Sequence, residues 1–255
     1  MRARSRSFQR VIALGVLGAG VAHAGSSDVE PAYRHQIALA FWQGAFKGNQ
    51  QALNEEFQRN GFSGTGSFWS MSGLEIDVTL WRWRMSLGIA EDWLARTTVR
   101  NTSTGAEARV QPTLSYVDLG YYAYVSRELN VYPLAGVSFD GVNLTVDPNA
   151  SPLVAQELHL YPKLSEVSIE RSSFAVNLGL GIEHFLPFAE QRSAAAVPGI
   201  VFGVRFGYLV PFWHRDWVYT YGSFSRHVPG LPPVDLGGPY VLGSIGFAWA
   251  QEGRR

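Results

Sequence analysis

The residues best suited to catalysis form a short serine and histidine group in the last part of the chain. Ser223, Ser225 and His227 alternate along one segment, beside a proline-rich stretch. Serine, histidine and an acid can together form a hydrolytic triad, so a hydrolase acting on lipid or peptide is one alternative. The chain has no Gly-x-Ser-x-Gly elbow and no His-Glu-x-x-His spacing. We therefore interpret this group as ordinary polar residues. We predict that the chain is not an enzyme and has no catalytic, cofactor or metal site.

A second group is electrostatic. Five charged residues stand nearly alone among glycine, serine and alanine in segments of alternating polarity: Arg82, Arg84, Asp118, Glu183 and Arg205. If these segments enclose an interior, the five side chains must pair there, because an unpaired buried charge is very costly. We predict a structural ion-pair network that fills the core. A polar path for small ions or a ligand site are the alternatives.

Composition excludes several classes of protein. The absence of cysteine excludes a disulfide framework, a thiolate nucleophile and cysteine-ligated metal sites. Equal numbers of basic and acidic residues, 21 each, with only Lys47 and Lys163 as lysines, argue against nucleic-acid binding. An apolar content of 46% argues against disorder.

The first 24 residues read as a removable leader. Four arginines and no acid precede an apolar run over Val11–Val21, and Ala22-His23-Ala24 supplies the small residues of a cleavage site. Eleven helical residues span roughly 16 Å, too short to cross a bilayer. We predict a secretory signal peptide over 1–24 and one domain over 25–255. Without the leader, 17 basic residues face 21 acidic ones, a formal charge of −4.

The rest of the chain reads as β-strands, because apolar residues alternate with small or polar ones. In one segment Phe174, Leu178 and Leu180 share a face, and Gly179 and Glu183 share the other. Eight segments are candidates: 36–46, 81–89, 117–125, 129–146, 173–183, 200–210, 217–226 and 241–249. A ten-strand count, with an extra pair near Leu153–Tyr161, is the alternative.

Alternation alone does not say which face lies outside. A water-facing exterior needs many charged residues, but here the non-apolar face is mostly glycine, serine, alanine and asparagine. Such a face suits the crowded interior of a small barrel, with the apolar face against lipid. A soluble calycin-like barrel that binds an apolar ligand has the reverse orientation and is the competing interpretation.

Aromatic residues near the strand ends predict interfacial girdles. We assign to them Trp42, Phe46, Trp93, Phe185, Phe188, Phe212, Trp213 and Trp217. Within Leu74–Ile89 the apolar phase flips between Leu80 and Trp81, which we interpret as a bulge or bend within one strand. With that count the connections do not alternate cleanly between short and long, and the short Ser126–Asn130 turn falls where an external loop is expected. A short loop helix is expected near 49–59, stopped by Asn60-Gly61.

Three segments carry a resemblance to a known family. LNVYPLAGVSF (129–139), GIVFGVRFGYLVPF (199–212) and GPYVLGSIGFAWA (238–250) are similar to strands of small, uncharacterised bacterial outer-membrane β-barrel proteins. The resemblance implies an architecture and not a reaction. One departure is that family members commonly end on an aromatic residue, whereas here Trp249 is followed by Ala250 and a polar tail.

The prediction as a whole is an all-β, antiparallel up-and-down transmembrane barrel of eight strands in the bacterial outer membrane. Its expected role is structural or interaction-mediating through external loops, with a narrow polar lumen. The expected partners are outer-membrane lipid and the outer-membrane assembly machinery, with no nucleic acid, and the expected state is a monomer.

Overall fold

The structure, a computed structural model, describes residues 33–92, 97–126, 129–146, 167–188, 196–221 and 224–252. The predicted leader (1–24), Trp93 and the segment 153–161 lie outside these ranges. No helix in the described part of the chain is long and apolar enough to cross a membrane.

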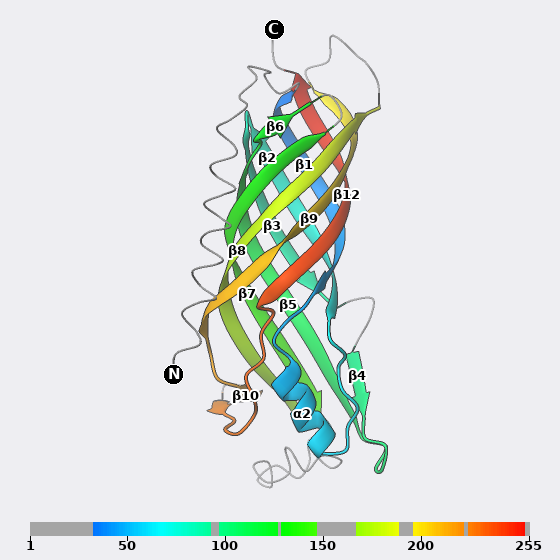
Figure 1. Cartoon of the computed structure of the whole chain (residues 1–255), viewed down its shortest axis with the longest axis vertical. Helices are drawn as coiled ribbons and strands as arrows, with labels where there is room; N and C mark the ends of the chain where they lie inside the picture. Colours follow the sequence, from blue (N-terminus) through cyan, green and yellow to red (C-terminus); the bar gives the residue numbers. More distant parts are fainter. Residues whose placement is uncertain are drawn as a thin grey trace.

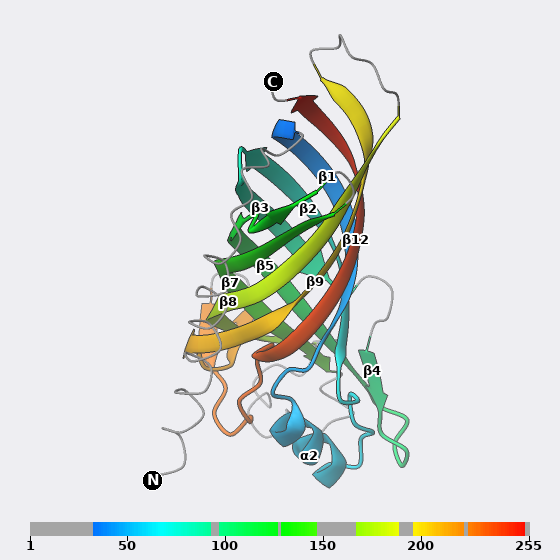
Figure 2. The same cartoon turned by 45° about the horizontal axis from the view of Figure 1, so that its top comes forward.

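Eight long antiparallel strands form a closed barrel, which confirms the predicted fold class. Each strand pairs with its neighbours along the chain, and β12 returns to pair with β1 (Figures 1 and 2). The strands are β1 (Tyr33–Phe46), β2 (Trp69–Leu80), β3 (Trp83–Glu91), β5 (Glu107–Tyr121), β7 (Asn130–Val146), β8 (Val167–Pro187), β9 (Val197–His214) and β12 (Gly238–Glu252).

The shorter elements belong to the connections. The predicted loop helix is confirmed as α2 (Gln51–Arg59), which buries Leu53 and Phe57 and is followed by Asn60 and a left-handed Gly61. Four short strands accompany it: β4 (Thr97–Arg100), β6 (Tyr124–Val125), β10 (Val218–Tyr221) and β11 (Phe224–His227). We call the barrel end that carries α2, β4, β10 and β11 the loop end; it lies at the bottom of Figure 1. The opposite end, where β1 begins and β12 finishes, is the terminal end.

The predicted bulge between Leu80 and Trp81 is wrong. Leu80 pairs with Trp83, so β2 and β3 form a hairpin whose two-residue turn is Trp81-Arg82. Trp81 adopts φ 56°, the left-handed conformation that such tight hairpin turns require. The apolar phase flips because the chain reverses direction, and each half keeps its apolar residues on the outside.

A second correction concerns segment 217–226. It is not a barrel strand but spans β10 and most of β11, a small hairpin at the loop end. The predicted count of eight barrel strands therefore holds. Segment 217–226 is lost from the count, and the strand predicted within Leu74–Ile89 becomes two strands, β2 and β3. With this assignment the connections alternate. The β2–β3, β5–β7 and β8–β9 turns lie at the terminal end, where the Ser126–Asn130 turn belongs, and the longer connections lie at the loop end.

The apolar faces of the strands point outward, as predicted. Phe174, Leu178 and Leu180 are 41%, 36% and 41% exposed. In β3 the exposed residues are Trp83, Met85, Leu87 and Ile89, and the alternate ones are buried. The barrel is therefore apolar outside and filled inside.

The aromatic girdle prediction is partly wrong. Trp42, Phe46, Phe185 and Trp217 are buried, because their positions fall on inward faces or under the loops. Exposed aromatic residues do mark both ends of the outer surface. Trp81, Trp83, Tyr124, Phe188 and Trp249 lie near the terminal end, and Phe139, Phe174, Phe212 and Trp213 lie toward the loop end.

Inward-facing rings are accommodated by glycine on the neighbouring strand. A Cβ added at Gly88 would overlap the ring of Tyr116, and one at Gly181 would overlap Tyr132. The rings and glycines interlock across the sheet, since close packing leaves no free volume in so narrow a barrel.

Beyond the barrel, part of the wall continues at the loop end as a sheet in the order β4–β5–β7–β8–β10–β11. Leu53 and Phe57 of α2 belong to the same buried cluster as Val99, Leu144 and Ile169 of this sheet. Figure 2 shows α2 beside this end of the barrel.

Candidate functional site: the filled lumen

The centre of the lumen holds a cluster of charged residues around Arg84. Its Nη2 lies 2.7 Å from Oδ2 of Asp77 and 3.1 Å from Oε1 of Glu75, and its Nε lies 3.2 Å from Oε2 of Glu183. Its Nη1 donates to the hydroxyl of Ser86 at 2.7 Å. One guanidinium thus joins strands β2, β3 and β8 across the interior.

Arg205 enters the same cluster from β9. It forms an ion pair with Glu75, and its Nη1 lies 3.9 Å from Oδ2 of Asp118. Glu75 therefore lies between two guanidinium groups. All six charged residues of this cluster, Glu75, Asp77, Arg84, Asp118, Glu183 and Arg205, are at most 5% exposed.

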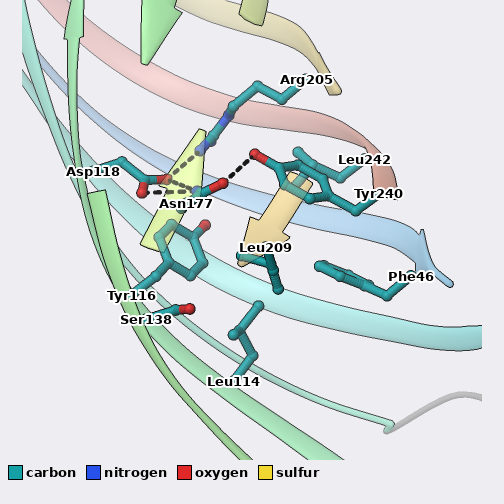
Figure 3. Close-up of a pocket in the computed structure, with 10 residues that line it drawn as sticks. All are labelled: Phe46, Leu114, Tyr116, Asp118, Ser138, Asn177, Arg205, Leu209, Tyr240 and Leu242. Carbon is teal, nitrogen blue, oxygen red and sulfur yellow. Dashed lines mark hydrogen bonds and ion pairs between the residues drawn. The ribbon is translucent and has the colours of Figure 1, made fainter. Parts of the chain in front are cut away.

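Tyrosine hydroxyls and an amide complete the hydrogen bonding. Tyr116 donates to Oε2 of Glu75 at 2.6 Å, and Tyr122 donates to Oε1 of Glu183 at 2.5 Å. Asn177 donates to both oxygens of Asp118 at 2.8 and 2.9 Å, and accepts from Tyr240 at 2.9 Å (Figure 3). We call these residues together with the six charged ones the lumen network.

The lumen network holds more acid than base. Four carboxyl groups face two guanidinium groups, and Oδ1 of Asp77 is buried without a hydrogen-bond partner among the described residues. No group of three histidine, aspartate or glutamate side chains in the described ranges is placed to hold a metal ion. The chemistry available here is ion pairing across a narrow interior.

Four of the five residues singled out from the sequence meet in this cluster: Arg84, Asp118, Glu183 and Arg205. The fifth residue, Arg82, lies at the terminal end of the barrel. It occupies the β2–β3 turn, is half-buried, and its carbonyl accepts a hydrogen bond from the Tyr122 amide. Glu75 and Asp77 were missed, although they alternate with Leu74, Ile76 and Val78 and could have been recognised had the hairpin been placed correctly.

The loop-end half of the lumen is mostly apolar, although it also buries Asp140 and Arg171. Trp42, Trp69, Met71 and Leu209 are at most 2% exposed and belong to one buried cluster. Between this cluster and the lumen network lies a small cavity with room for about one water molecule, lined by Tyr116 and Arg205 among others (Figure 3).

The segment Val228–Gly237, which we call the strap, covers the loop end. Its Val234 and Leu236 are at most 1% exposed and belong to the apolar cluster. The amide of Leu236 donates to Oδ2 of Asp140 at 3.2 Å, and Nε1 of Trp217 donates to the carbonyl of Pro232 at 2.8 Å. Charged side chains thus fill the middle of the lumen, and apolar side chains fill most of its loop-end side.

The serine and histidine group considered from the sequence lies at the loop end. Ser225 and His227 are exposed on β11, and the Ser225 hydroxyl lies 3.4 Å from that of Thr220. Ser223 lies outside the described residues. The neighbour of the Ser225 hydroxyl is thus another hydroxyl.

Comparison with known proteins gives structural likeness only. No family model matches the chain, and no curated protein matches it. Three solved outer-membrane proteins are similar in structure. Neisserial surface protein A is 8% identical in sequence, and the match covers 86% of this chain and 97% of that one with a TM-score of 0.36. A major outer membrane protein from Thermus thermophilus is 13% identical, and the match covers 84% of this chain and 98% of that one with a TM-score of 0.38. OprG from Pseudomonas aeruginosa is 13% identical, and the match covers 88% of this chain and 98% of that one with a TM-score of 0.40. Likeness at this level shows a similar barrel fold and nothing about function.

Proposed function

We propose that the chain is an integral outer-membrane β-barrel protein with a sealed lumen, a monomer that is not an enzyme and acts as a structural or interaction protein through its loop end. The observation that carries this proposal is the outer surface. Large apolar side chains project from every barrel strand, among them Ile37, Ile76, Leu87, Leu119, Val137, Leu180, Val204 and Ile245, each about half exposed. An apolar surface that encircles a protein on all sides requires a lipid environment.

The height and ends of this surface also support the proposal. On β8 the outward positions from Phe174 to Leu186 cover 12 residue steps, roughly 30 Å along the barrel axis for a strand tilted by about 40°. This length matches the hydrocarbon thickness of a bilayer. Exposed aromatic residues mark both limits, where their rings suit the interface.

The filled lumen supports a role other than transport. Apolar side chains close the interior on the loop-end side of the lumen network, and hydrated ions do not cross such a region readily. We expect the purified protein to produce no ion conductance in planar bilayers. Stable conductance steps would contradict the sealed lumen while leaving the membrane location intact.

Folding in lipid tests the membrane location. The folded protein should require detergent or lipid to stay in solution and should migrate differently on gels before and after heating. Leu87→Arg places a charge on the lipid-facing surface and should destabilise the barrel by about 2–4 kcal/mol. Thr98→Arg, at an exposed position of β4, is the matched control and should have little effect. A folded chain that is soluble without detergent would overturn the proposal.

Export follows from the same proposal. The leader over 1–24 is expected to be removed after Ala24, and N-terminal sequencing of the folded protein should begin at Gly25. Insertion would then need the outer-membrane assembly machinery, acting on a last strand that carries Phe247 and Trp249 on its outer face. For the non-enzymatic role, lipid or peptide turnover that is lost in His227→Ala would be the contradicting result.

A further inference from the structure

Four aromatic side chains gather on the outer surface where it approaches the loop end. Phe174 of β8 packs against Phe139 of β7, with ring centroids 5.1 Å apart, and against Phe212 and Trp213 of β9, at 6.4 and 5.5 Å. The four side chains are 41–63% exposed. We call them the aromatic quartet.

A bulge in β9 creates this arrangement. The pairing of β8 with β9 shifts between Phe174 and Ala175, because Phe174 pairs with Trp213 and Ala175 pairs with Pro211. Phe212 is the extra residue, and the bulge allows two consecutive aromatic side chains to be exposed. A regular strand would bury one of them.

On the loop-end side of the quartet, the outward positions change from apolar to polar residues. Toward the loop end, the next outward position on β8 is Ser172, which is only 8% exposed, and the exposed Glu170 follows it. On β7 the partly buried Asn143 lies on the loop-end side of Phe139. Hydrocarbon contact thus ends at the quartet. The headgroup layer of a membrane that surrounds the barrel begins at the level of Ser172.

Arg215 is fixed at this level. Its amide donates to the carbonyl of Ser172 at 2.8 Å, and its side chain is exposed. The charged neighbours along the chain act on the inner side: His214 interacts electrostatically with Asp235 of the strap, and Asp216 with the buried Arg171. On the outer side, Oε1 of Glu170 accepts a hydrogen bond from Ser172 at 3.3 Å.

We propose that the aromatic quartet and Arg215 form a docking site for one phosphate-bearing lipid of the leaflet that surrounds the loop end, with acyl chains on the rings and the phosphate on the guanidinium. An arginine binds phosphate through paired, charge-assisted hydrogen bonds, and aromatic rings favour the adjoining interface. This proposal rests on the proposed function, since it needs the apolar surface to lie in a bilayer.

The test uses the complete folded protein in nanodiscs of zwitterionic phospholipid, doped with bisphosphorylated lipid A or with the same lipid after removal of its phosphates. Lipid retention is measured by native mass spectrometry. The phosphorylated lipid should be retained in preference to the dephosphorylated one. Arg215→Gln should weaken its retention roughly five- to tenfold, and Trp213→Leu should weaken the retention of both forms.

Arg100→Gln is the matched control. Arg100 is also an exposed arginine at the loop end, but it pairs with Glu107 on the β4–β5 hairpin. Equal retention of the two lipids, or equal effects of the Arg215 and Arg100 substitutions, would overturn the docking site while the barrel remains in the nanodisc. A protein that does not enter the nanodisc at all would instead overturn the proposed function.

Discussion

Nε of Arg84 lies 3.2 Å from Oε2 of Glu183, so an ion pair connects β3 to β8 through the interior of the barrel. The two strands are not neighbours in the sheet, since β5 and β7 separate them in the wall. Arg205 and Glu75 make the corresponding connection between β9 and β2. The barrel is therefore braced from within as well as hydrogen-bonded around its circumference.

Replacing Arg84 should cost most of what this bracing contributes. Arg84→Gln leaves Asp77, Glu75 and Glu183 without one of their cations in a dry interior, and loss of one partner of a buried pair costs about 3–5 kcal/mol. The free energy of unfolding, measured by denaturant titration in lipid, should fall by that amount. Arg59→Gln, at an exposed i,i+3 and i,i+4 pair on α2, should change it by less than about 1 kcal/mol. Equal losses would mean that the interior charges are not coupled.

Gly88→Ala tests the interlocking of rings and glycines. The new Cβ would overlap the ring of Tyr116, which must move and lose its 2.6 Å hydrogen bond to Glu75. Overpacking of this kind costs about 1–3 kcal/mol, measured in the same unfolding experiment. Gly243→Ala is the control, because Gly243 is exposed and the nearest atom to its added Cβ is the Gly203 carbonyl at 4.0 Å. An unchanged stability of the Gly88 variant would show that the ring has room to shift.

Leu236→Ala should loosen the strap. Leu236 is fully buried, and truncating such a leucine costs about 2–5 kcal/mol. Because the lost contacts hold the strap to the barrel, we expect faster protease cleavage within Val228–Gly237 and faster hydrogen exchange of the Leu236 amide. Pro233→Ala, at an exposed position of the strap, should leave both rates unchanged. An amide at position 236 that exchanges in Leu236→Ala at the wild-type rate would contradict this prediction.

The β4–β5 hairpin should weaken in acid. Arg100 donates to Glu107, and this hydrogen bond and the guanidinium charge lower the pKa of Glu107 below its ordinary value. The ionised form is thus favoured in the folded state. Its contribution is complete above the unfolded-state pKa and is lost as pH falls through the lowered one. Carboxyl NMR titration should give a pKa for Glu107 that rises toward the ordinary range in Arg100→Gln. A Glu107 titration that is identical in the two proteins would contradict the pairing.

The sequence was informative wherever alternation is strict. Over Phe174–Ile182 of β8 and Ile200–Val210 of β9 every second residue is large and apolar, and most of β3 and β12 follow the same pattern. This pattern predicts both the strands and their orientation. It was less informative at the Leu80–Trp81 flip, since a bulge and a two-residue turn both change the phase by one residue. The choice mattered, because it hid the inward positions of Glu75 and Asp77 and with them half of the acids in the lumen network.

Trp42, Phe46 and Trp217 show a second limit. A tryptophan near a strand end is equally suited to a lipid interface and to an interior capped by loops, and composition does not separate the two. Here the loop end folds over the mouth, and these rings lie beneath it. Contacts such as that between Leu236 and Asp140 join residues 96 positions apart, and no local pattern could have indicated them.

The closure of β12 on β1 has a consequence for how the chain folds. Arg205 and Glu75 are 130 residues apart in the chain, and the shorter route through the wall between the strands that carry them runs through β12 and β1. An open sheet lacking β12 would hold these charges apart in a partly apolar environment, where each is costly. Contacts between residues so far apart in the chain make folding slow. Because an incomplete barrel leaves these charges unpaired, partly folded states are unfavourable and folding is cooperative. Pairing of β12 with β1 is therefore the step after which the whole chain reaches the folded state.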